Sequence, residues 1–456
     1  MSSASSPPPV TSDLLRARRS GPLRGRCTVP GDKSISHRAL LFGALSDGPV
    51  AITGLGRGGD NLSTARALAA LGVTIDIDAA GGEARVVGAG FRGLRAAAHA
   101  LDCGNSGTTI RLLTGLLAGQ PFETTLEGDA SLTRRPMRRL ATPLRAMGAS
   151  VEGRTEPAKP HDIFPPLRVK GGALHGVTYT LPVASAQLKS ALVLAGLQAV
   201  GRTIITEPGL SRDHTERMLS FLGAPITADA TTRTVTVDPA GWGGRLRAAP
   251  ITVPGDLSSA AFLIVAALVV PGSEVTVEGI GLNPTRTGIL DALAQMGADL
   301  EVTETGNAMG EPVGRVRVRA SRLHGIEIGA ALALRSIDEI PALTVAAALA
   351  SGRTVFSDLH ELRVKESDRI AALARELGRA GVPVEERPDG LVVDGLDGKP
   401  ARGGTVRPEH DHRIAMAGAV LGLAAEAGDE TLIPADDIAT SFPAFAETLR
   451  TLGAVL

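Results

Sequence analysis

The sequence has little of what would build a disulfide-stabilised, metal-bound or nucleic-acid-binding protein. Its 456 residues include two cysteines, Cys27 and Cys103, too few for a disulfide framework and without the spacing of a zinc site. Aromatic residues make up 2% of the chain, which leaves little material for stacking on bases. The formal net charge of −1 gives no overall field to attract nucleic acid or an anionic membrane. We therefore expect neither as a partner.

A long apolar run is also missing. The best candidate, Ala260 to Val270, is shorter than the roughly 20 residues that span a bilayer, and Pro271 and Gly272 follow it. Residues 1–20 have no apolar region of the kind found in signal peptides, and we expect them to form a disordered leader. These features predict a cytoplasmic protein. The length of the chain predicts at least two domains.

Lysine is scarce compared with arginine. Lysine and arginine total 47 residues, of which six are lysines: Lys33, Lys159, Lys170, Lys189, Lys365 and Lys399. Arginine stays protonated, whereas the pKa of a lysine can be moved into the range of proton-transfer chemistry. A lysine inside a polar motif, such as Lys33, is therefore a candidate for chemistry. Chance surface placement is an equal alternative for Lys159, Lys170 and Lys399.

A pattern of a helix, a glycine and a strand recurs six times, at spacings of 72 to 84 residues. Its glycines are Gly72, Gly148, Gly223, Gly297, Gly381 and Gly453. Glycine is expected at the left-handed C-cap of a helix, and the residues that follow are typical of strands. A second helix in each repeat is rich in alanine, leucine and valine on most faces and should be buried. Six such α/β units exceed one core and predict two similar domains of three units each.

The pentapeptide TVPGD occurs twice, at Thr28–Asp32 and Thr252–Asp256, three units apart. We interpret the two copies as the points where the chain crosses between the domains. The first domain is then residues 32–252, and the second is residues 21–31 together with residues 253–456. Lys33 follows the first copy, whereas Leu257 follows the second.

Polar loops precede the predicted helices, and several of these helices begin with a cation. Ser, Thr, Asp and Asn are ordinary N-caps, but a cation opposes the helix dipole. The cations at helix starts are Lys33, Arg38, Arg111, Lys189, Lys365 and Arg413. They indicate a pocket for anions built from several helix ends. The stretch Gly31–Ser34 lacks the upstream glycine of a P-loop, and His410 with His412 lacks a third ligand for a metal.

Nine motifs in order then resemble one family. They are GDKSISHRA, GNSGTTIR, RRPM, SAQLKSA, NPTRTG, IDEIPAL, LRVKESDR, DHRIAM and ATSFP, and the resemblance runs from about residue 21 to residue 456. Together they are similar to the EPSP synthase family, the 3-phosphoshikimate 1-carboxyvinyltransferases. The resemblance implies two domains, each of three βαβαββ units whose parallel helices are buried (an inside-out α/β barrel), with the active site between the domains.

The resemblance also implies the reaction and its residues. The 5-hydroxyl of shikimate 3-phosphate attacks C2 of phosphoenolpyruvate, a tetrahedral adduct forms and phosphate leaves, with no cofactor or metal. Shikimate 3-phosphate would be bound by Lys33, Ser34, Arg38, Ser185, Ala186, Gln187, Ser211, Asp338 and Lys365. Phosphoenolpyruvate would be bound by Lys33, Gly107, Arg135, Gln187, Arg369 and Arg413. Asp338 resembles the base, and either Glu366 or Lys33 the acid.

Some positions depart from the family pattern. Thr440 stands where many members carry a lysine before the Ser-Phe-Pro segment, His214 where a tyrosine is frequent, and Leu112 where a proline is frequent. Gly107 occupies the position at which glyphosate-tolerant members often carry alanine.

The nearest alternative is the sister enzyme that acts on UDP-N-acetylglucosamine, which typically uses a cysteine in a loop where this chain has none. A second alternative is a non-catalytic receptor for phosphorylated metabolites, and we expect a monomer in any of these cases.

Overall fold

The computed structural model describes residues 14–78 and 82–456. The protein has two hydrophobic cores, each built around a group of three apolar helices. In the first group α1 and α5 contact α3, and in the second α7, α10 and α12 contact one another. The six helices are α1 (Lys33–Ala44), α3 (Gly107–Leu117), α5 (Ala186–Gly196), α7 (Leu257–Val269), α10 (Ile340–Leu349) and α12 (His412–Gly422). Their alanine, leucine and valine side chains are buried on most faces, as the sequence predicts.

A second set of helices ends at the recurring glycines. These helices are α2 (Gly59–Ala70), α4 (Arg138–Ala146), α6 (His214–Phe221), α8 (Gly288–Gln295), α11 (Arg369–Arg379) and α14 (Phe445–Thr451). All six glycines have positive φ angles, between 80° and 108°, which an L-residue with a side chain rarely adopts. The predicted left-handed C-caps are therefore confirmed. Shorter helical segments are α9 (Ala330–Arg335), α13 (Ala435–Ala439), η1 (Leu132–Arg134) and η2 (His360–Val364).

The strands of the described residues form six small sheets, of which five share one four-stranded order and the sixth has three strands. A parallel pair is extended by antiparallel strands, as in β6-β7-β9-β8. The first half holds β3 (Pro49–Thr53), β4 (Thr74–Ile77), β5 (Ala84–Val87), β6 (Leu101–Asp102), β7 (Glu123–Glu127), β8 (Ser150–Glu156), β9 (Lys159–Lys170), β10 (Thr178–Thr180), β11 (Thr203–Thr206), β12 (Ile226–Asp229), β13 (Thr234–Val237) and β14 (Ile251–Thr252). The second half holds β1 (Leu14–Arg18), β2 (Arg24–Cys27), β15 (Glu274–Gly281), β16 (Asp299–Ala308), β17 (Glu311–Arg319), β18 (Glu327–Ile328), β19 (Arg353–Phe356), β20 (Val384–Arg387), β21 (Gly390–Asp394), β22 (Gly404–Thr405) and β23 (Glu430–Pro434). The predicted α/β fold of repeated units is confirmed.

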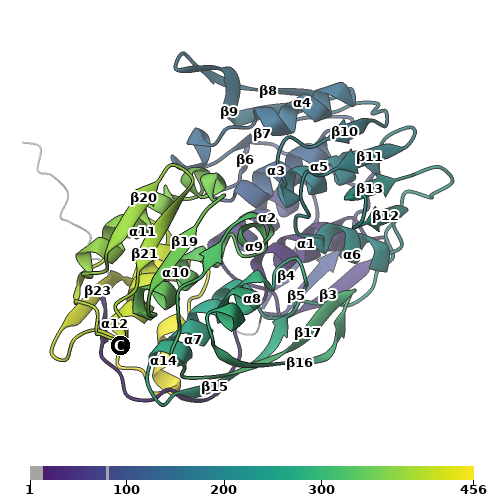
Figure 1. Ribbon diagram of the computed structural model, residues 1–456. Coiled ribbons are helices and arrows are strands. Elements are labelled where there is room, and N and C mark those ends of the chain that lie inside the picture. The colour runs from purple at the N-terminus through teal and green to yellow at the C-terminus, as the bar shows by residue number, and fades with distance from the viewer. Residues whose placement is uncertain (1–13, 79–81) are drawn as a thin grey trace, which may run out of the picture.

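Two strands show where the chain passes from one half to the other. Strand β2 precedes the first half in sequence but pairs with β15 of the second, and β14 pairs with β3 of the first. The buried apolar residues likewise fall into two clusters. One extends from Ile35 to Val253 with Met309 added, and the other contains Leu15–Leu23 and Leu257–Ala454. In Figure 1 the purple-to-teal half and the green-to-yellow half lie side by side.

The expected disordered leader is wrong for residues 14–20. Leu14–Arg18 form β1, which pairs antiparallel with β23 in the sixth sheet. In the other five sheets the strand at this position, such as β9 beside β7, comes from the same repeat unit. The backbone N–H of Arg18 donates to the carbonyl of Val455, so the C-terminal residues lie beside β1 as well. The sixth unit is thus completed by the N-terminal part of the chain. The rest of the expected leader, residues 1–13, lies outside the described residues.

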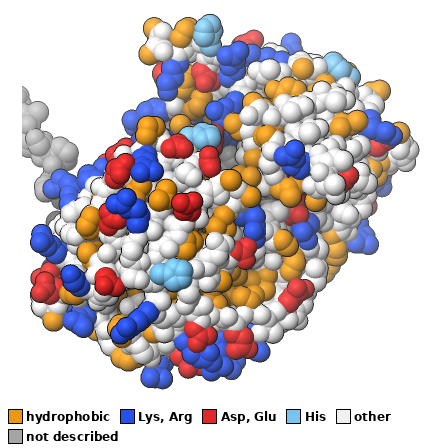
Figure 2. Space-filling model, in the orientation of Figure 1, with side chains coloured by type: hydrophobic (Ala, Val, Ile, Leu, Met, Phe, Trp, Pro, Cys, Tyr) orange, Lys and Arg blue, Asp and Glu red, His pale blue; other side chains and the backbone are white. Residues whose placement is uncertain are grey.

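Charges of both signs are interspersed over the face seen in Figure 2, in keeping with the net charge of −1. Among the described residues, no helix combines the length and the apolar character that crossing a membrane requires.

Candidate active site

A cavity of about 690 Å³ lies between the two halves and is bordered by residues from both, many of them polar. The first half contributes Asp32, Lys33, Ser34, Asp60, Gly107, Thr108, Arg111, Arg135, Arg139, Ser185, Ala186, Gln187, Ser211 and Arg212. The second half contributes Asp256, Ser258, Arg286, Asp338, Asp358, His360, Glu361, Lys365, Glu366 and Arg413. Many of these residues come from the loops before the helices, where the sequence places its polar motifs.

The two TVPGD segments lie side by side, and Asp32 and Asp256 both border this cavity. The backbone N–H of Asp32 donates to the carbonyl of Pro254, and that of Asp256 donates to Pro30, both at 2.8 Å. The carboxylates of Asp32 and Asp256 cap α1 and α7, accepting from the N–H groups of Ile35 and Ser258. The two crossing points are therefore bonded to each other and each begins a buried helix.

Lys33, the first residue of α1, faces the cavity and pairs with Asp60 at the start of α2. The distance from Lys33 Nζ to Asp60 Oδ2 is 2.6 Å. Burial opposes the charge on Lys33, but Asp60 and Glu366 outweigh it and raise the pKa of Lys33 above its ordinary value. Lys33 is thus protonated at neutral pH.

Asp338 precedes α10 and is surrounded by cations from both halves. Arg212, in the loop before α6, donates to Asp338 Oδ2, while Lys365 and Arg369 lie 3.3 and 3.4 Å from Oδ1. Arg413 donates to the backbone carbonyl of Asp338 at 2.8 Å. Burial opposes ionisation of the Asp338 carboxyl, but these cations hold its pKa well below its ordinary value. The carboxylate is therefore ionised and free of a proton at neutral pH.

Glu366 is held by a buried guanidinium behind the cavity wall. Arg369 Nη2 donates to Glu366 Oε2 at 2.8 Å, and Arg369 Nε donates to Asp411 Oδ2 at 2.7 Å. Burial raises the pKa of Glu366, but Arg369, Lys33 and Arg135 lower it to well below its ordinary value. Glu366 borders the cavity, whereas Arg369 is 1% exposed and reaches it only through Glu366 and Asp338.

A guanidinium pair lies against the N-terminus of α3. A Cβ atom added to Gly107 would come within 2.6 Å of Arg111 Nη1 and 2.9 Å of Arg135 Nη1. Arg111 also donates to Gln187 Oε1 at 2.8 Å, and Gln187 donates to Thr108 at 2.9 Å. The glycine therefore leaves room for both guanidinium groups beside the N–H groups that begin the helix.

Like Arg369, Arg38 and Ser211 were expected to contact a substrate and are engaged by the protein itself. Arg38 is 2% exposed and does not border the cavity, and its guanidinium donates to Thr215, Ser190 and the carbonyl of Ser34. The hydroxyl of Ser211 donates to Glu207, although Ser211 borders the cavity.

Lys189 also differs from the expectation that a cation at a helix start marks a ligand anion. It is 2% exposed and pairs with Glu207 and Glu216, each at 2.7 Å. The anions that balance its charge belong to the chain itself. Lys189 therefore joins α5, α6 and the end of β11 and takes no part in the cavity wall.

Sequence reasoning did not single out several charged residues of the cavity, among them Asp60, Arg212 and Arg286. Arg212 directly follows Ser211 in the loop SRDHTE, and Arg286 lies within NPTRTG, so the motifs contained both. What the sequence did not provide was the pairing across the two halves. For Asp60, the only feature of the sequence that could have indicated a role was its position at the start of a helix.

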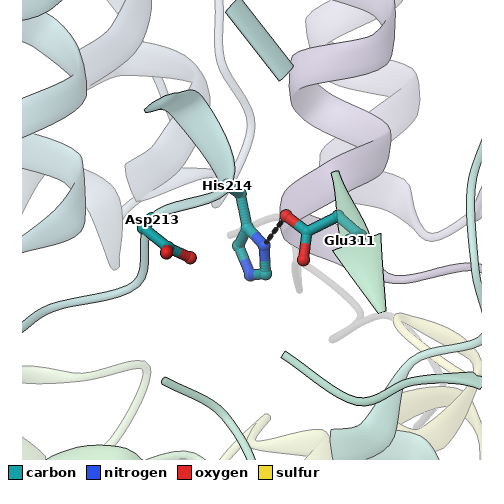
Figure 3. Close-up of side chains that lie close together, drawn as sticks. All are labelled: Asp213, His214 and Glu311. Carbon is teal, nitrogen blue, oxygen red and sulfur yellow. Dashed lines mark hydrogen bonds and ion pairs between the residues drawn. The ribbon is translucent and has the colours of Figure 1, made fainter. Parts of the chain in front are cut away.

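One group of described residues has the composition of a metal site. Asp213 and His214 lie opposite Glu311 of the second half (Figure 3). His214 Nδ1 is 2.8 Å from Glu311 Oε1, and Asn283 donates to the other oxygen of Glu311 and to Asp213 Oδ1. Arg217 donates to Asp213 Oδ2. Because every carboxylate oxygen of the group has a partner in the protein, we interpret it as a contact between the halves.

Comparison with known proteins gives a consistent result. The family model described as EPSP synthase (3-phosphoshikimate 1-carboxyvinyltransferase) matches residues 17–449. The chain is 51% identical over 428 residues to a 3-phosphoshikimate 1-carboxyvinyltransferase of Geobacter sulfurreducens, covering 94% of this chain and 96% of that protein. It is 51% identical over 440 residues to the enzyme of that name from Halorhodospira halophila, covering 96% of each chain.

A solved structure agrees with these relatives. EPSP synthase from Acinetobacter baumannii superposes with a TM-score of 0.84 at 42% identity, covering 97% of this chain and 98% of that one. With its repeated units and a cation-lined cavity between two halves, the chain belongs to the EPSP synthase family.

Proposed function

We propose that the protein transfers the enolpyruvyl group of phosphoenolpyruvate to the 5-hydroxyl of shikimate 3-phosphate. The products are 5-enolpyruvylshikimate 3-phosphate and inorganic phosphate, in the pathway to chorismate and the aromatic amino acids. The observation that carries the proposal is the cavity between the halves, where a protonated Lys33 and an ionised Asp338 lie among arginines from both sides. A cavity of this kind suits two phosphorylated anions and a reaction that moves protons.

The two substrates occupy different parts of the cavity in this proposal. Shikimate 3-phosphate lies on the α5 side, where Ser185, Ala186 and Gln187 border the cavity, with Ser34, Ser211 and Lys365 nearby. Phosphoenolpyruvate lies against Gly107, Arg135 and Arg413, with Lys33 between the substrates. Bidentate pairing of guanidinium with carboxylate or phosphate supports this division. Arg38 and Arg369 act by holding Ser34, Asp338 and Glu366, whose contacts they share.

The charge states favour one assignment of the acid and the base. Asp338 is ionised and accepts the proton of the 5-hydroxyl as the oxygen attacks C2 of phosphoenolpyruvate. Of the two candidate acids, Lys33 carries a proton at neutral pH, whereas Arg369, Lys33 and Arg135 together keep Glu366 ionised. Lys33 therefore protonates the methylene carbon, and Glu366, whose charge helps to keep Lys33 protonated, takes part in the later loss of a proton from that carbon.

We assign the two halves to domains that close on the substrates. Residues 32–252 form one domain and residues 21–31 with 253–456 the other, to which β1 is added. The two helix clusters and the exchanged strands β2 and β14 support these boundaries. Ion pairs that cross the cavity, Arg139 with Glu361 at 2.8 Å and Arg212 with Asp338, are the contacts that closure would rearrange. Unchanged small-angle scattering on addition of both substrates would count against closure.

Release of inorganic phosphate tests the function. The protein should release phosphate when mixed with shikimate 3-phosphate and phosphoenolpyruvate, without an added metal or cofactor. Release with UDP-N-acetylglucosamine in place of shikimate 3-phosphate would assign the chain to the sister reaction. Tight binding of both substrates without turnover would instead assign it to a metabolite receptor.

Light scattering of the purified protein tests the expected monomer, and fractionation of the source cells tests the expected cytoplasmic location.

A further inference from the structure

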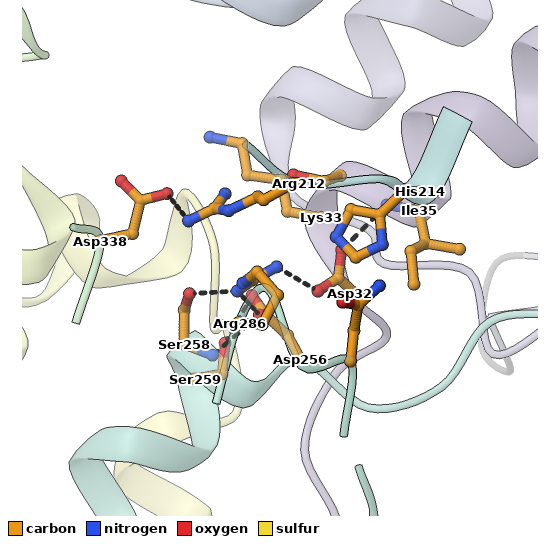
Figure 4. A network of polar contacts seen from close by, with 12 residues as sticks. Asp32, Lys33, Ile35, Arg212, His214, Asp256, Ser258, Ser259, Arg286 and Asp338 are labelled. Carbon is orange, nitrogen blue, oxygen red and sulfur yellow. Dashed lines mark hydrogen bonds and ion pairs between the residues drawn. The ribbon is translucent and has the colours of Figure 1, made fainter. Parts of the chain in front are cut away.

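Arg286 lies at the junction of the two crossing segments, in the loop between β15 and α8. Its side chain is 3% exposed and its terminal nitrogens are bonded to the protein. Nη1 donates to Asp32 Oδ2 at 2.8 Å, and Nη2 donates to Ser258 Oγ at 2.6 Å, with Asp256 at 3.2 Å and Glu339 at 3.3 Å. Figure 4 shows this guanidinium between Asp32 on one side and Ser258 on the other.

The partners of Arg286 lie at the starts of three different helices. Asp32 caps α1, Asp256 caps α7, and Glu339 stands immediately before α10 without using its side chain as a cap. Two of these partners are neighbours of the proposed catalytic groups, because Lys33 follows Asp32 and Asp338 precedes Glu339. One guanidinium therefore joins the backbone that carries the proposed acid to the backbone that carries the proposed base, from opposite halves of the molecule.

The geometry of the cluster suits an arginine. Three buried carboxylates surround one cation, and the planar guanidinium holds two donor nitrogens at a fixed separation, so that each bonds to groups on a different side, whereas a lysine has a single nitrogen. Burial raises the pKa of Asp32, but Arg286 and other cations lower it to well below its ordinary value, whereas burial and the charge of Asp32 raise the pKa of Asp256. Since both terminal nitrogens of Arg286 are engaged by the protein, the side chain is occupied in holding the site and does not offer them to a substrate.

We propose that Arg286 is a positioning residue that fixes Lys33 and Asp338 relative to each other across the cavity. The inference rests on the proposed function, in which these two groups exchange protons with the bound substrates. A displacement of about 1 Å in such an arrangement can cost about 100-fold in rate without preventing binding. Loss of the Arg286 guanidinium should therefore lower kcat and leave substrate binding almost intact.

The test compares Arg286→Lys with the wild-type protein in the phosphate-release assay. Lysine keeps the positive charge, so the variant should fold, but its shorter side chain and single nitrogen do not reproduce the contacts that Nη1 makes with Asp32 and Nη2 makes with Ser258 and Glu339. We expect kcat to fall by about 100-fold, while KM for each substrate changes by less than about threefold. The matched control is Arg353→Lys, which removes an exposed guanidinium that donates to both carboxylate oxygens of Asp394, and it should leave kcat unchanged. Equal kcat per folded molecule in the wild type and Arg286→Lys would overturn the inference.

A double variant separates positioning from general destabilisation. Asp32→Asn keeps an N-cap for α1 and removes the charge that Arg286 binds. If Arg286 acts through Asp32, the combined variant should lose much less activity than the product of the two single losses. Losses that multiply would overturn the inference. A wild-type protein that releases no phosphate would remove the proposed function and the inference together, whereas an active wild type beside an unaffected Arg286→Lys would remove the inference alone.

Discussion

The two TVPGD segments have the same sequence, cap equivalent helices and donate to each other's proline carbonyls, yet the residues that follow them differ in every chemical respect. Lys33 borders the cavity and is paired with Asp60. Leu257 is 1% exposed and packs into the apolar cluster of the second half. Repetition thus accounts for the scaffold, and the departure from repetition at this position accounts for the chemistry.

The same contrast separates the two aspartates. Asp32 is bonded to Arg286 at 2.8 Å and its pKa is lowered, whereas the pKa of Asp256 is raised by burial and by Asp32. Asp32 is therefore held ionised beside the guanidinium. The carboxyl of Asp256, at the equivalent position, has the higher pKa of the two.

Conversion of the first segment into the second should have the largest effect. Lys33→Leu gives TVPGDL at both positions and removes the proposed acid and its charge. We expect phosphate release to fall by at least about 1,000-fold, within the range measured for loss of general acid–base catalysis. Leu257→Met is the control and should keep nearly full activity, because it conserves the volume of a buried side chain. Retention of substantial turnover in Lys33→Leu would contradict the assignment.

Removal of the base should cost somewhat less. Asp338→Asn keeps the shape of the side chain but cannot take the proton of the 5-hydroxyl, and we expect kcat to fall by about 100-fold or more. Binding of shikimate 3-phosphate, measured by calorimetry, should persist because Arg212 and Lys365 lose a competing carboxylate. Loss of binding with kcat preserved would assign Asp338 to recognition instead.

The two capping aspartates should differ in stability. At pH 7 we expect Asp32→Asn to lower the free energy of unfolding by about 3 kcal/mol, because it breaks a buried ion pair. Asp256→Asn should change it by less than about 1 kcal/mol, since asparagine keeps the cap and replaces a carboxyl whose ionisation is disfavoured. Urea unfolding of both variants measures the difference.

The pH dependence of that difference follows from the two pKa shifts. The lowered pKa of Asp32 gives stability that is present above the unfolded-state pKa, about 4, and is lost as the pH falls toward the folded pKa. The raised pKa of Asp256 gives stability that is present below about 4 and is lost as the pH rises. The gap between the variants should therefore narrow as the pH is lowered through about 4. A gap that is constant with pH would mean that charge is not its cause.

An exposed pair across the cavity should matter least. Arg139 and Glu361 are 51% and 36% exposed, so water screens their attraction. We expect Glu361→Gln to change the free energy of unfolding by less than about 0.5 kcal/mol and kcat by less than about twofold. An effect on kcat comparable to that of Asp338→Asn would show that closure depends on this surface pair.

Local signals in the sequence were sufficient for the repeated parts of the fold. A glycine after each outer helix and apolar residues on most faces of the inner helices act within a few residues, and the structure has them as predicted. Strand β1 was missed because its partner, β23, lies more than 400 residues away in sequence and the sixth unit is incomplete without it.

The site was predicted less completely than the fold for the same physical reason. A cation at the start of a helix indicates an anion, but the sequence does not say whether a ligand or the chain supplies it. For Lys33 the cavity is open to a ligand, whereas for Lys189 the anions are Glu207 and Glu216. Arg212 and Arg286 act across the boundary between the halves, which motif spacing along one half does not reveal.

Phosphate release by Lys33→Arg is the sharpest test of Lys33 as the acid, because arginine keeps the charge at this position but does not give up a proton in proteins. With both substrates saturating, we expect bound substrates and a turnover at least about 100-fold below that of the wild type. Turnover close to the wild-type value would show that only a positive charge is needed at this position, and it would contradict the role given to Lys33.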